Sequence, residues 1–326
     1  MIVGQDKAVE EFAKAWAARK LHHAWLLAGP RGVGKASFAR SAARRVLADA
    51  AGPVVGLAGL ETPDDHPIVK LVEAGSHPDM RWLERLAREK GEGLARDITI
   101  RQVRELGEFM GMTAALSAWR VAVIDSLDEL NKEASNALLK MLEEPPPNTL
   151  FLLVSHAPGR LLPTIRSRCR LLHFEALDDD AMTSILETSL PELGPSERKR
   201  IVSMSFGSAG RALAFAELEL AKLEETAIAI LRDGDPTNAR RAELASELGK
   251  KASADRYFAF LDLAPSLIAR EARSLRGNKL ERALDAYAKT RELAAIAPRL
   301  SLDPAATVFQ IGGILADVAG PASLKR

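Results

Sequence analysis

A glycine-rich segment near the N-terminus has the residue types and spacing of a phosphate-binding loop. It reads Gly29-Pro30-Arg31-Gly32-Val33-Gly34-Lys35-Ala36, which matches glycine, four free positions, glycine and lysine, with Ser or Thr expected last. Gly29, Gly32 and Gly34 let the backbone amides turn inward around a phosphate, and Lys35 adds a positive charge for the outer phosphates. Ala36 stands where a hydroxyl would hold Mg²⁺. The loop therefore predicts phosphate binding without its metal ligand.

The residues on either side of this loop predict the strand and the helix that it requires. The run His22–Ala28 is mostly apolar and ends at Gly29, which is typical of a short buried strand. From Gly34 onward, apolar residues share one broad helical face. Ser37 is not expected to replace the missing hydroxyl, because one residue along a helix turns the side chain by roughly 100°. The alternative is a glycine-rich turn that merely joins a strand to a helix.

A later strand should carry the acidic residue of a nucleotide site, and the run from Trp119 to Asp125 fits that role. In a nucleotide-hydrolysing enzyme such an Asp holds the Mg²⁺ shell, and an acid directly after it often orients the attacking water. Here the next residue is Ser126, whose hydroxyl cannot take a proton from water at neutral pH. Asp128 and Glu129 are expected at the start of the next helix, pointing elsewhere. Asp125 could instead be an ordinary strand-end acid that caps a helix.

Three arginines, Arg166, Arg168 and Arg170, lie close together before the last strand expected in the first section. Cations at this spacing repel one another, which is tolerated where they lie in solvent or meet anions. Two interpretations remain: a solvated basic turn, or an arginine finger that stabilises phosphoryl-transfer charge on the nucleotide of a neighbouring subunit. Cys169 is expected to be a small packed residue, because no neighbouring His forms a catalytic pair with it.

Composition limits the functional classes that remain. The chain has 326 residues, with Lys+Arg 45 against Asp+Glu 44 and a formal net charge of +1, so no global field draws it to nucleic acid or membrane. Its single cysteine rules out a disulfide framework and suits a reducing compartment. The sequence shows no signal peptide and no apolar run long enough to cross a bilayer. It predicts a soluble, cytoplasmic protein with no membrane partner.

Strands alternate with helices up to about Glu175, which predicts a parallel sheet with helices on both faces. Further strands are expected over Met80–Leu83, Leu150–Val154 and Leu171–Phe174. Helices are expected over 5–20, from a capping box at Thr99 to about 112, and over 131–143 before three prolines. The charged stretch 85–96 should form an exposed hairpin or a mobile loop.

After residue 176 the strand signals fade and the pattern becomes helical. Helices are expected over 178–190, over 195–206 and from 207 through Arg211, as a small helical domain. From about residue 222 the helical pattern resumes, with breaks at 234–236, at Gly277 and around 302–304. Apolar residues of this last part are expected to form core rather than interface, among them Phe258, Leu261, Leu263 and Leu267.

Three segments resemble the clamp-loader AAA+ subunits of bacterial DNA polymerase III. Ser167-Arg168-Cys169 is similar to the Ser-Arg-Cys signature of that family, and the run Asn136–Pro146 is similar to its specific helix-and-turn segment. Gly4-Gln5 resembles the family's N-terminal segment near the adenine. The resemblance spans residues 2 to about 211. It implies an α/β AAA+ P-loop domain (1–175), a small helical lid (176–219) and an all-α collar (220–326) that assembles a five-subunit ring.

The resemblance also implies roles for single residues. Gly4 would lie near the adenine of ATP, Arg211 would correspond to a lid arginine that touches nucleotide, and His156 to a residue that senses the γ-phosphate. Gly210 would insert one residue and could turn Arg211 away. Arg168 would act in trans as an arginine finger on a neighbouring subunit. His156 could equally be a loop histidine.

Two departures from the family pattern, Ala36 and Ser126, favour a member that does not hydrolyse ATP. Such a subunit could still bind ATP through Lys35. Many relatives hold zinc through four cysteines after the phosphate loop; this chain has none there, and His66 and His77 are too few for a structural site, so no zinc is expected. The loop 51–79 must then hold itself together by packing.

The resemblance therefore implies a subunit without ATPase activity of its own, within a DNA polymerase holoenzyme. It would brace a ring containing the delta and gamma or tau subunits and help load the sliding clamp onto primer–template DNA. One alternative is an active AAA+ ATPase, either a gamma/tau-type motor or a DNA-remodelling enzyme. Another is a degenerate nucleotide-binding adaptor with no role in replication.

Overall fold

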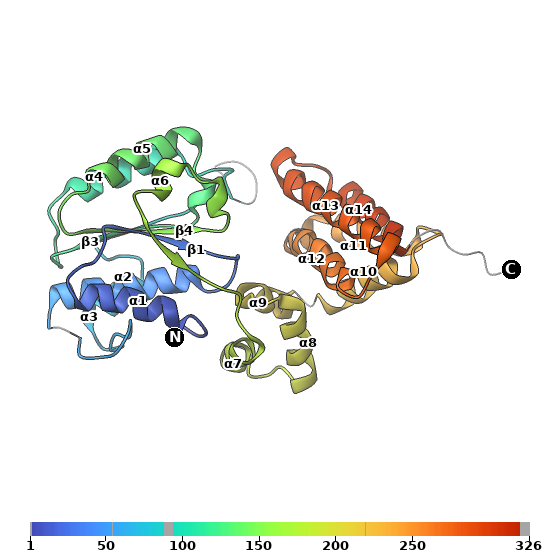
Figure 1. Cartoon of the computed structure of the whole chain (residues 1–326), viewed down its shortest axis with the longest axis horizontal. Coiled ribbons are helices and arrows are strands. Elements are labelled where there is room, and N and C mark those ends of the chain that lie inside the picture. Colours follow the sequence, from blue (N-terminus) through green and yellow to red (C-terminus); the bar gives the residue numbers. More distant parts are fainter. Residues whose placement is uncertain (1, 54, 88–93, 219, 320–326) are drawn as a thin grey trace. The chain divides into compact units, whose positions relative to one another are not determined.

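The computed structural model describes residues 2–53, 55–87, 94–218 and 220–319. The chain divides into two compact units, Met1–Ala212 and Leu213–Arg326, which are coloured blue to yellow and yellow to red in Figure 1. The expected hairpin over 85–96 lies largely outside the described residues, although Ala87 and Leu94 form an isolated antiparallel bridge. The division into three domains at 175/176 and 219/220 stays a prediction.

The first unit is built on a five-stranded parallel sheet with the order β2-β3-β4-β1-β5. Every strand that the sequence predicted is present, within one or two residues at each end. The strands are β1 (Ala24–Ala28), β2 (Met80–Leu83), β3 (Arg120–Ile124), β4 (Thr149–Ser155) and β5 (Arg170–His173). Because β1 pairs with β4 and β5, the strand that leads into the glycine-rich loop has a neighbour on each side.

Helices cover both faces of the sheet, as predicted (Figure 1). Side chains alternate between the faces with a period of two. In β1, Trp25 and Leu27 belong to one buried cluster, whereas Leu26 belongs to the other. The first face carries α1 (Asp6–Ala17), α2 (Lys35–Ala51) and α3 (Pro67–Glu73), and the second carries α4 (Ile100–Gly111), α5 (Lys132–Glu143) and the short α6 (Pro163–Arg166).

Local sequence signals fix where the helices begin. In α4 the predicted capping box is present: the Thr99 amide donates to Gln102 Oε1 over 3.0 Å, and the Thr99 hydroxyl accepts from the Gln102 amide. The Asn131 side chain accepts from the Ala134 amide at the start of α5. By contrast, Gly34 at the start of α2 provides no side-chain cap. The first-turn amides of α2 therefore have no side-chain acceptor from that position and are available to an anion.

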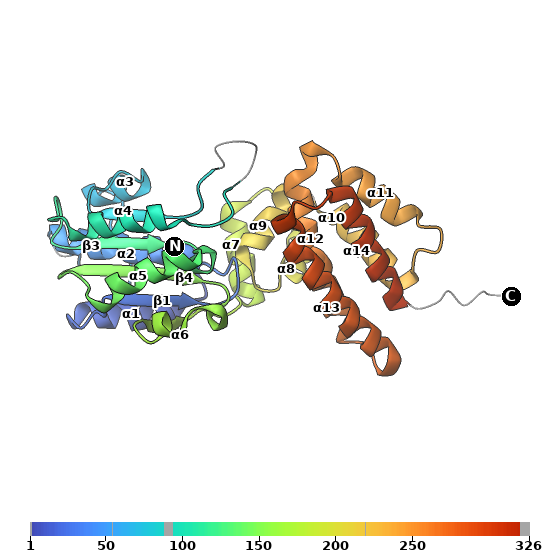
Figure 2. The same ribbon diagram turned by 90° about the horizontal axis from the view of Figure 1, so that it is seen from above.

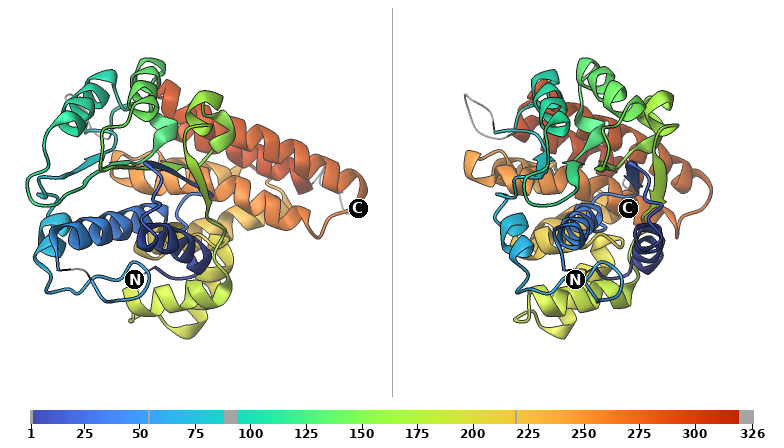
Figure 3. Two further views of the ribbon diagram at one scale, coloured as in Figure 1. Left: turned by 60° about the vertical axis from the view of Figure 1, so that its left-hand side comes forward. Right: turned by 90° about the vertical axis from the view of Figure 1, so that its left-hand side faces the viewer.

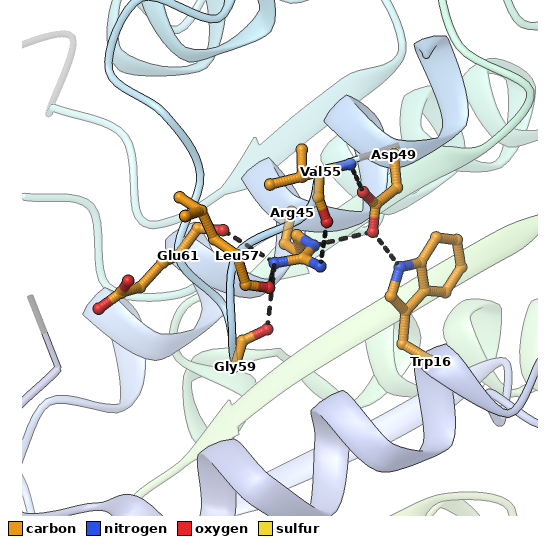
Figure 4. Close-up of polar contacts among 7 residues, drawn as sticks. All are labelled: Trp16, Arg45, Asp49, Val55, Leu57, Gly59 and Glu61. Atoms are coloured by element: carbon orange, nitrogen blue, oxygen red, sulfur yellow. Dashed lines mark hydrogen bonds and ion pairs between the residues drawn. The ribbon is translucent and has the colours of Figure 1, made fainter. Parts of the chain in front are cut away.

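A buried arginine holds the loop that follows α2 (Figure 4). Arg45 is 9% exposed, pairs with Asp49 over 2.8 Å, and donates to backbone carbonyls of the loop, those of Val55, Leu57, Gly59 and Glu61. Asp49 in turn accepts from the Trp16 indole and from the Val55 amide. The sequence predicted that packing would hold this loop, and Val55 and Leu60 do pack in the first buried cluster. The convergence of the loop carbonyls on one guanidinium is a further hold that the sequence did not predict.

Residues 176–217 contain three further helices. They are α7 (Asp179–Ser189), α8 (Pro195–Ser205) and α9 (Ala209–Glu217), and they match the predicted helical segments. Asp178 caps α7 by accepting from the Ala181 amide over 2.8 Å. The boundary between the two compact units falls within α9.

The described part of the second unit is helical throughout (Figures 2 and 3). Helix α14 contacts the four other long helices, and its Val308, Ile311 and Leu315 are fully buried. The helices are α10 (Ala221–Asp233), α11 (Ala239–Leu248), α12 (Ala254–Ala272), α13 (Gly277–Leu300) and α14 (Pro304–Ala319). The predicted breaks at 234–236, at Gly277 and at 302–304 are all present.

The prediction that Phe258 belongs to the core of the second unit is wrong. Leu261, Leu263 and Leu267 are buried as expected, but Phe258 is 50% exposed. The buried stripe of α12 passes through Tyr257, so the next residue along the helix projects off its edge.

Candidate nucleotide-binding site

A cavity of about 400 Å³ opens where the carboxyl ends of β1, β2, β3 and β4 meet the start of α2. Ligands of open parallel sheets bind at this edge, and the volume is in the range of a small-molecule site. The lining residues come from five segments of the chain: Arg31, Gly32, Gly34, Lys35, Ala36, Ser37, Glu84, Arg85, Leu94, Asp125, Ser126, Glu129, Val154 and His156. Several residues singled out from the sequence are therefore brought together: Gly32, Gly34, Lys35, Ala36, Asp125, Ser126 and His156.

The Lys35 ammonium lies inside the glycine-rich loop. It is 3% exposed, and its Nζ donates to the carbonyls of Gly29 (2.7 Å) and Pro30. Burial lowers the pKa of Lys35 to about 8, and the carboxylates of Asp125 and Asp128 oppose that shift. A bound phosphate could replace the two carbonyls as the partner of this ammonium. The loop and the uncapped start of α2 thus fit the phosphates of a nucleotide.

Ala36 lines the cavity, so the position of the expected metal ligand is occupied by a methyl group. Ser37 lines the same cavity and is exposed. The expectation that Ser37 does not replace the missing hydroxyl stays a prediction. Within the described residues, no group of three or more His, Cys, Asp or Glu side chains could hold a metal ion. The residues present do not fit a Mg²⁺ site of the usual P-loop kind.

Three carboxylates face the cavity. Burial raises the pKa of Asp125, and the neighbouring carboxylates of Glu84 and Glu129 add to this, while Lys35 and Arg31 oppose it. Glu129 also bridges two cations, with Oε1 3.5 Å from Arg31 and Oε2 2.8 Å from Arg85. Sequence reasoning missed Glu84, although an acid directly after a parallel strand is the signal that singled out Asp125.

The prediction that Asp128 and Glu129 start the next helix and point elsewhere is wrong for Glu129, which lines the cavity, whereas Asp128 does not line it. They lie in a short 3-10 turn (Leu127–Glu129), which directs Glu129 to the cavity and Asp128 between two strand ends. The Asp128 carboxylate accepts from the hydroxyls of Ser126 (2.9 Å) and Ser155 (2.8 Å) and from the His156 amide. This carboxylate therefore links the loop after β3 to the loop after β4, and it engages the Ser126 hydroxyl.

His156 lines the cavity beside Lys35. Burial lowers the pKa of His156 to about 4, and the nearby charges of Lys35 and Arg31 contribute. Its Nδ1 is buried without a protein hydrogen-bond partner. The ring is thus neutral at physiological pH, and Nδ1 is a polar atom at the site without a protein partner. This accords with the predicted contact between His156 and a phosphate, which stays a prediction.

Three of the expected site residues lie beside the cavity rather than in its lining. Gly4 packs against the lid, where a Cβ would meet Leu177 Cδ2 at 2.7 Å. Gly29 lies under the chain after β5, and a Cβ there would meet the Phe174 carbonyl oxygen at 2.1 Å. Arg211 stacks over Phe206 at 5.9 Å. Their assigned nucleotide contacts stay predictions.

The lid touches the phosphate loop directly. The Gly210 amide donates to the Gly32 carbonyl over 2.9 Å, and a Cβ on Gly32 would meet the Ser208 hydroxyl at 2.2 Å. The Gln5 side-chain amide joins the loop to the chain after β5, since it donates to the carbonyls of Val33 and Glu175. Gly210 is thus a point of close backbone approach between the start of α9 and the glycine-rich loop.

Arg168 lies outside the cavity, at the end of α6. Its Nη2 is 2.7 Å from Glu143 Oε1 and its Nη1 donates to the Thr164 carbonyl over 2.9 Å, with a third of the side chain exposed. Cys169 packs against the second core cluster, and burial raises the pKa of its thiol to about 12. The predicted role of Cys169 as a packed residue accords with this environment, because a thiol with this pKa is not a nucleophile at neutral pH.

Comparison with known proteins assigns the family. Residues 4–178, more than half of the chain, match the family model described as DNA polymerase III, delta subunit. The chain belongs to this family. A segment of 186 residues is 36% identical to the DNA polymerase III subunit delta' of Pseudomonas aeruginosa and covers 57% of this chain and 53% of that protein. The expected resemblance to clamp-loader subunits of DNA polymerase III is confirmed, and the match is to a delta' subunit.

Two further proteins are similar to this chain. The DNA polymerase III subunit tau/gamma of Haemophilus influenzae is 32% identical over 64% of this chain and 28% of its own length. A DNA polymerase III gamma subunit-related protein of Thermotoga maritima matches with a TM-score of 0.44 and 15% identity, over 96% of this chain and 99% of that one. The chain spans about half, or less, of the length of the relatives it matches in sequence.

Among the described residues, no helix is both long enough and apolar enough to cross a membrane.

Proposed function

We propose that this chain is a clamp-loader subunit that binds ATP without hydrolysing it and supplies Arg168 in trans to a neighbouring ATPase subunit. It would brace a ring with delta and gamma or tau chains that loads the sliding clamp onto primer–template DNA. Family membership supports the clamp-loader part of this proposal. The site supports the rest, because it keeps the phosphate-binding Lys35 but has Ala36 and Ser126 where metal ligand and base are expected.

The observation that carries the proposal is the position of Arg168. Its guanidinium lies outside this chain's own cavity and is partly exposed, held by Glu143 and the Thr164 carbonyl. An arginine that stabilises transition-state charge in trans must reach out of its own subunit. A solvated basic turn remains the simpler alternative, and it predicts no effect on catalysis.

Replacement of Arg168 separates these interpretations. We expect Arg168→Ala to leave the melting temperature of the isolated chain unchanged and to lower the clamp- and DNA-stimulated ATPase of the reconstituted complex, with a loss at the neighbouring site of roughly 10³-fold. Arg166→Ala, which removes the nearby exposed cation, is the matched control. Unchanged turnover with Arg168→Ala would remove the finger assignment.

One observation favours a second candidate, an active AAA+ ATPase of the gamma/tau or DNA-remodelling type. Glu84 and Glu129 line the cavity beside Asp125, so carboxylates that could orient water are present even though Ser126 is not one. Hydrolysis by the isolated chain with Mg²⁺ and primed DNA tests this candidate. Rapid turnover that Glu129→Gln abolishes would establish it and overturn the non-hydrolysing role.

A further inference from the structure

The end of α5 and the end of α6 meet at the proposed finger. Glu143 is the last residue of α5, and its carboxylate lies 2.7 Å from Arg168 Nη2. From the other side, the carbonyl of Thr164 in α6 accepts from Arg168 Nη1 over 2.9 Å and from the Ser167 hydroxyl over 3.1 Å. The guanidinium is thus held at two of its nitrogens by two different helices.

Both helix ends are themselves fixed to the sheet core. Leu142 is 1% exposed, and its carbonyl lies 3.1 Å from His23 Nε2, at the start of β1. Ile165 is 1% exposed and anchors α6 in the same apolar cluster. A side chain carried by rigid, packed elements places its polar atoms more accurately than one on a loop. Glu143 is therefore a fixed point against which a mobile arginine can be oriented.

We propose that Glu143 is the positioning residue for Arg168, and this inference rests on the trans role proposed above. An arginine side chain loses considerable rotamer freedom when it is held in one geometry, so a pre-oriented guanidinium meets a phosphate at lower entropic cost. The guanidinium has five N–H donors. It can therefore keep Glu143 and Thr164 as partners and present its remaining donors to the nucleotide of a neighbouring subunit.

The ion pair between Arg168 and Glu143 is partly exposed, so its effect on the orientation of Arg168 can be measured apart from its effect on folding stability. The side chains of Arg168 and Glu143 are 33% and 47% exposed, and ion pairs this accessible contribute little to folding. The negative end of the α5 dipole lies at the same place and adds to the attraction for the guanidinium. Removal of the Glu143 carboxylate should consequently loosen the orientation of Arg168 without unfolding the chain.

The test uses the full chain in a reconstituted complex with delta, sliding clamp and primed DNA. The gamma or tau chains carry Ala at the arginine of their own Ser-Arg-Cys signature, so that Arg168 is the finger under observation. We expect Glu143→Ala to lower kcat for ATP roughly two- to fivefold with KM unchanged, and Glu143→Asp to recover part of the loss. Glu144→Ala removes the same charge one residue along the chain and is the matched control.

A double-mutant comparison decides whether Glu143 acts through Arg168. In the Arg168→Ala background, a further Glu143→Ala change should have no effect on kcat. An equal loss in both backgrounds, a gain in kcat, or a loss matched by Glu144→Ala would overturn the inference. If Arg168→Ala lowers turnover and Glu143→Ala does not, the inference fails while the proposed function stands. If neither variant lowers turnover, both fail.

Discussion

A single methyl group stands where a nucleotide site of this kind usually has a hydroxyl. Ala36 lines the cavity beside Lys35, and within the described residues no group of three or more His, Cys, Asp or Glu side chains could hold a metal ion. We expect Ala36→Thr to make nucleotide binding depend on Mg²⁺, with affinity roughly tenfold higher in Mg²⁺ than in EDTA, because the new hydroxyl can join the metal shell. Isothermal titration calorimetry with a non-hydrolysable ATP analogue measures this difference.

Ala36→Val is the control, because valine has the shape and bulk of threonine but lacks its hydroxyl. An equal response to Mg²⁺ in both variants would show that residue 36 does not lie in the metal shell. Hydrolysis should stay absent in Ala36→Thr, because Ser126 still stands in the position of the base.

The lowered pKa of Lys35 predicts a pH dependence of binding. A bound phosphate favours the charged ammonium, whereas burial without a ligand brings the pKa of Lys35 to about 8. Affinity for ATP should therefore be flat below pH 8 and fall above it, by at most about tenfold per pH unit. Calorimetric titrations between pH 7 and pH 9.5 measure the fall, and Lys35→Met should bind weakly with no such dependence.

The lowered pKa of Lys35 also makes the free energy of unfolding depend on pH, in a defined direction. In the unfolded chain Lys35 regains its ordinary pKa of 10.5. Between about pH 8 and that value, the unfolded chain holds a proton that the folded chain has lost. The contribution of Lys35 to the free energy of unfolding therefore rises with pH across this window. A fall in ATP affinity above pH 8 thus cannot be attributed to Lys35-linked unfolding.

Most of the site could be predicted from sequence because its residues lie in continuous motifs. The loop at Gly34-Lys35 and the strand-end Asp125 are both in the cavity, as the order of strand, loop and helix required. Glu129 was misplaced because the residues after β3 form a 3-10 turn, and nothing in their side chains distinguishes that turn from the start of an α-helix.

The helices and strands themselves followed from periodicity, from the capping box at Thr99 and from the prolines that end the helix starting near Asn131. The sequence could not predict how the loop after α2 is held in place. Arg45 is bound by backbone carbonyls, which every residue has, so no sequence pattern marks its partners (Figure 4). The polar network stands in the region where many relatives are expected to carry zinc.

The Arg45 network predicts a large loss of stability when its centre is removed. Arg45→Met leaves Asp49 buried without its cation and leaves the carbonyls of the loop without their donor. We expect the free energy of unfolding in urea to fall by about 3 kcal/mol. Arg44→Met is the control: its pair with Glu73 is longer, at 3.5 Å, and more exposed, so about 1 kcal/mol or less should be lost. Equal losses for the two variants would contradict the central role of Arg45.

The family match covers only one of the two compact units of the chain. The family match, residues 4–178, lies inside the first compact unit, Met1–Ala212. The second unit has its own buried helices around α14, and its proposed collar role rests on the family layout rather than on a match to its residues. The lid helices begin within the first unit, where they are joined to the phosphate loop.

This junction between lid and loop predicts the effect of one added methyl group. A Cβ on Gly210 would lie 3.1 Å from the Gly32 Cα, and the hydrogen bond from the Gly210 amide to the Gly32 carbonyl would lengthen. We expect Gly210→Ala to lower the free energy of unfolding by about 1–3 kcal/mol and to weaken ATP binding, because the lid no longer supports the loop. Gly159→Ala, where a Cβ meets nothing within 4 Å, controls for the loss of a glycine. If Gly210→Ala matches that control in urea unfolding and in calorimetry, the phosphate loop keeps its shape without the lid, and the close approach at Gly32 has no role in binding.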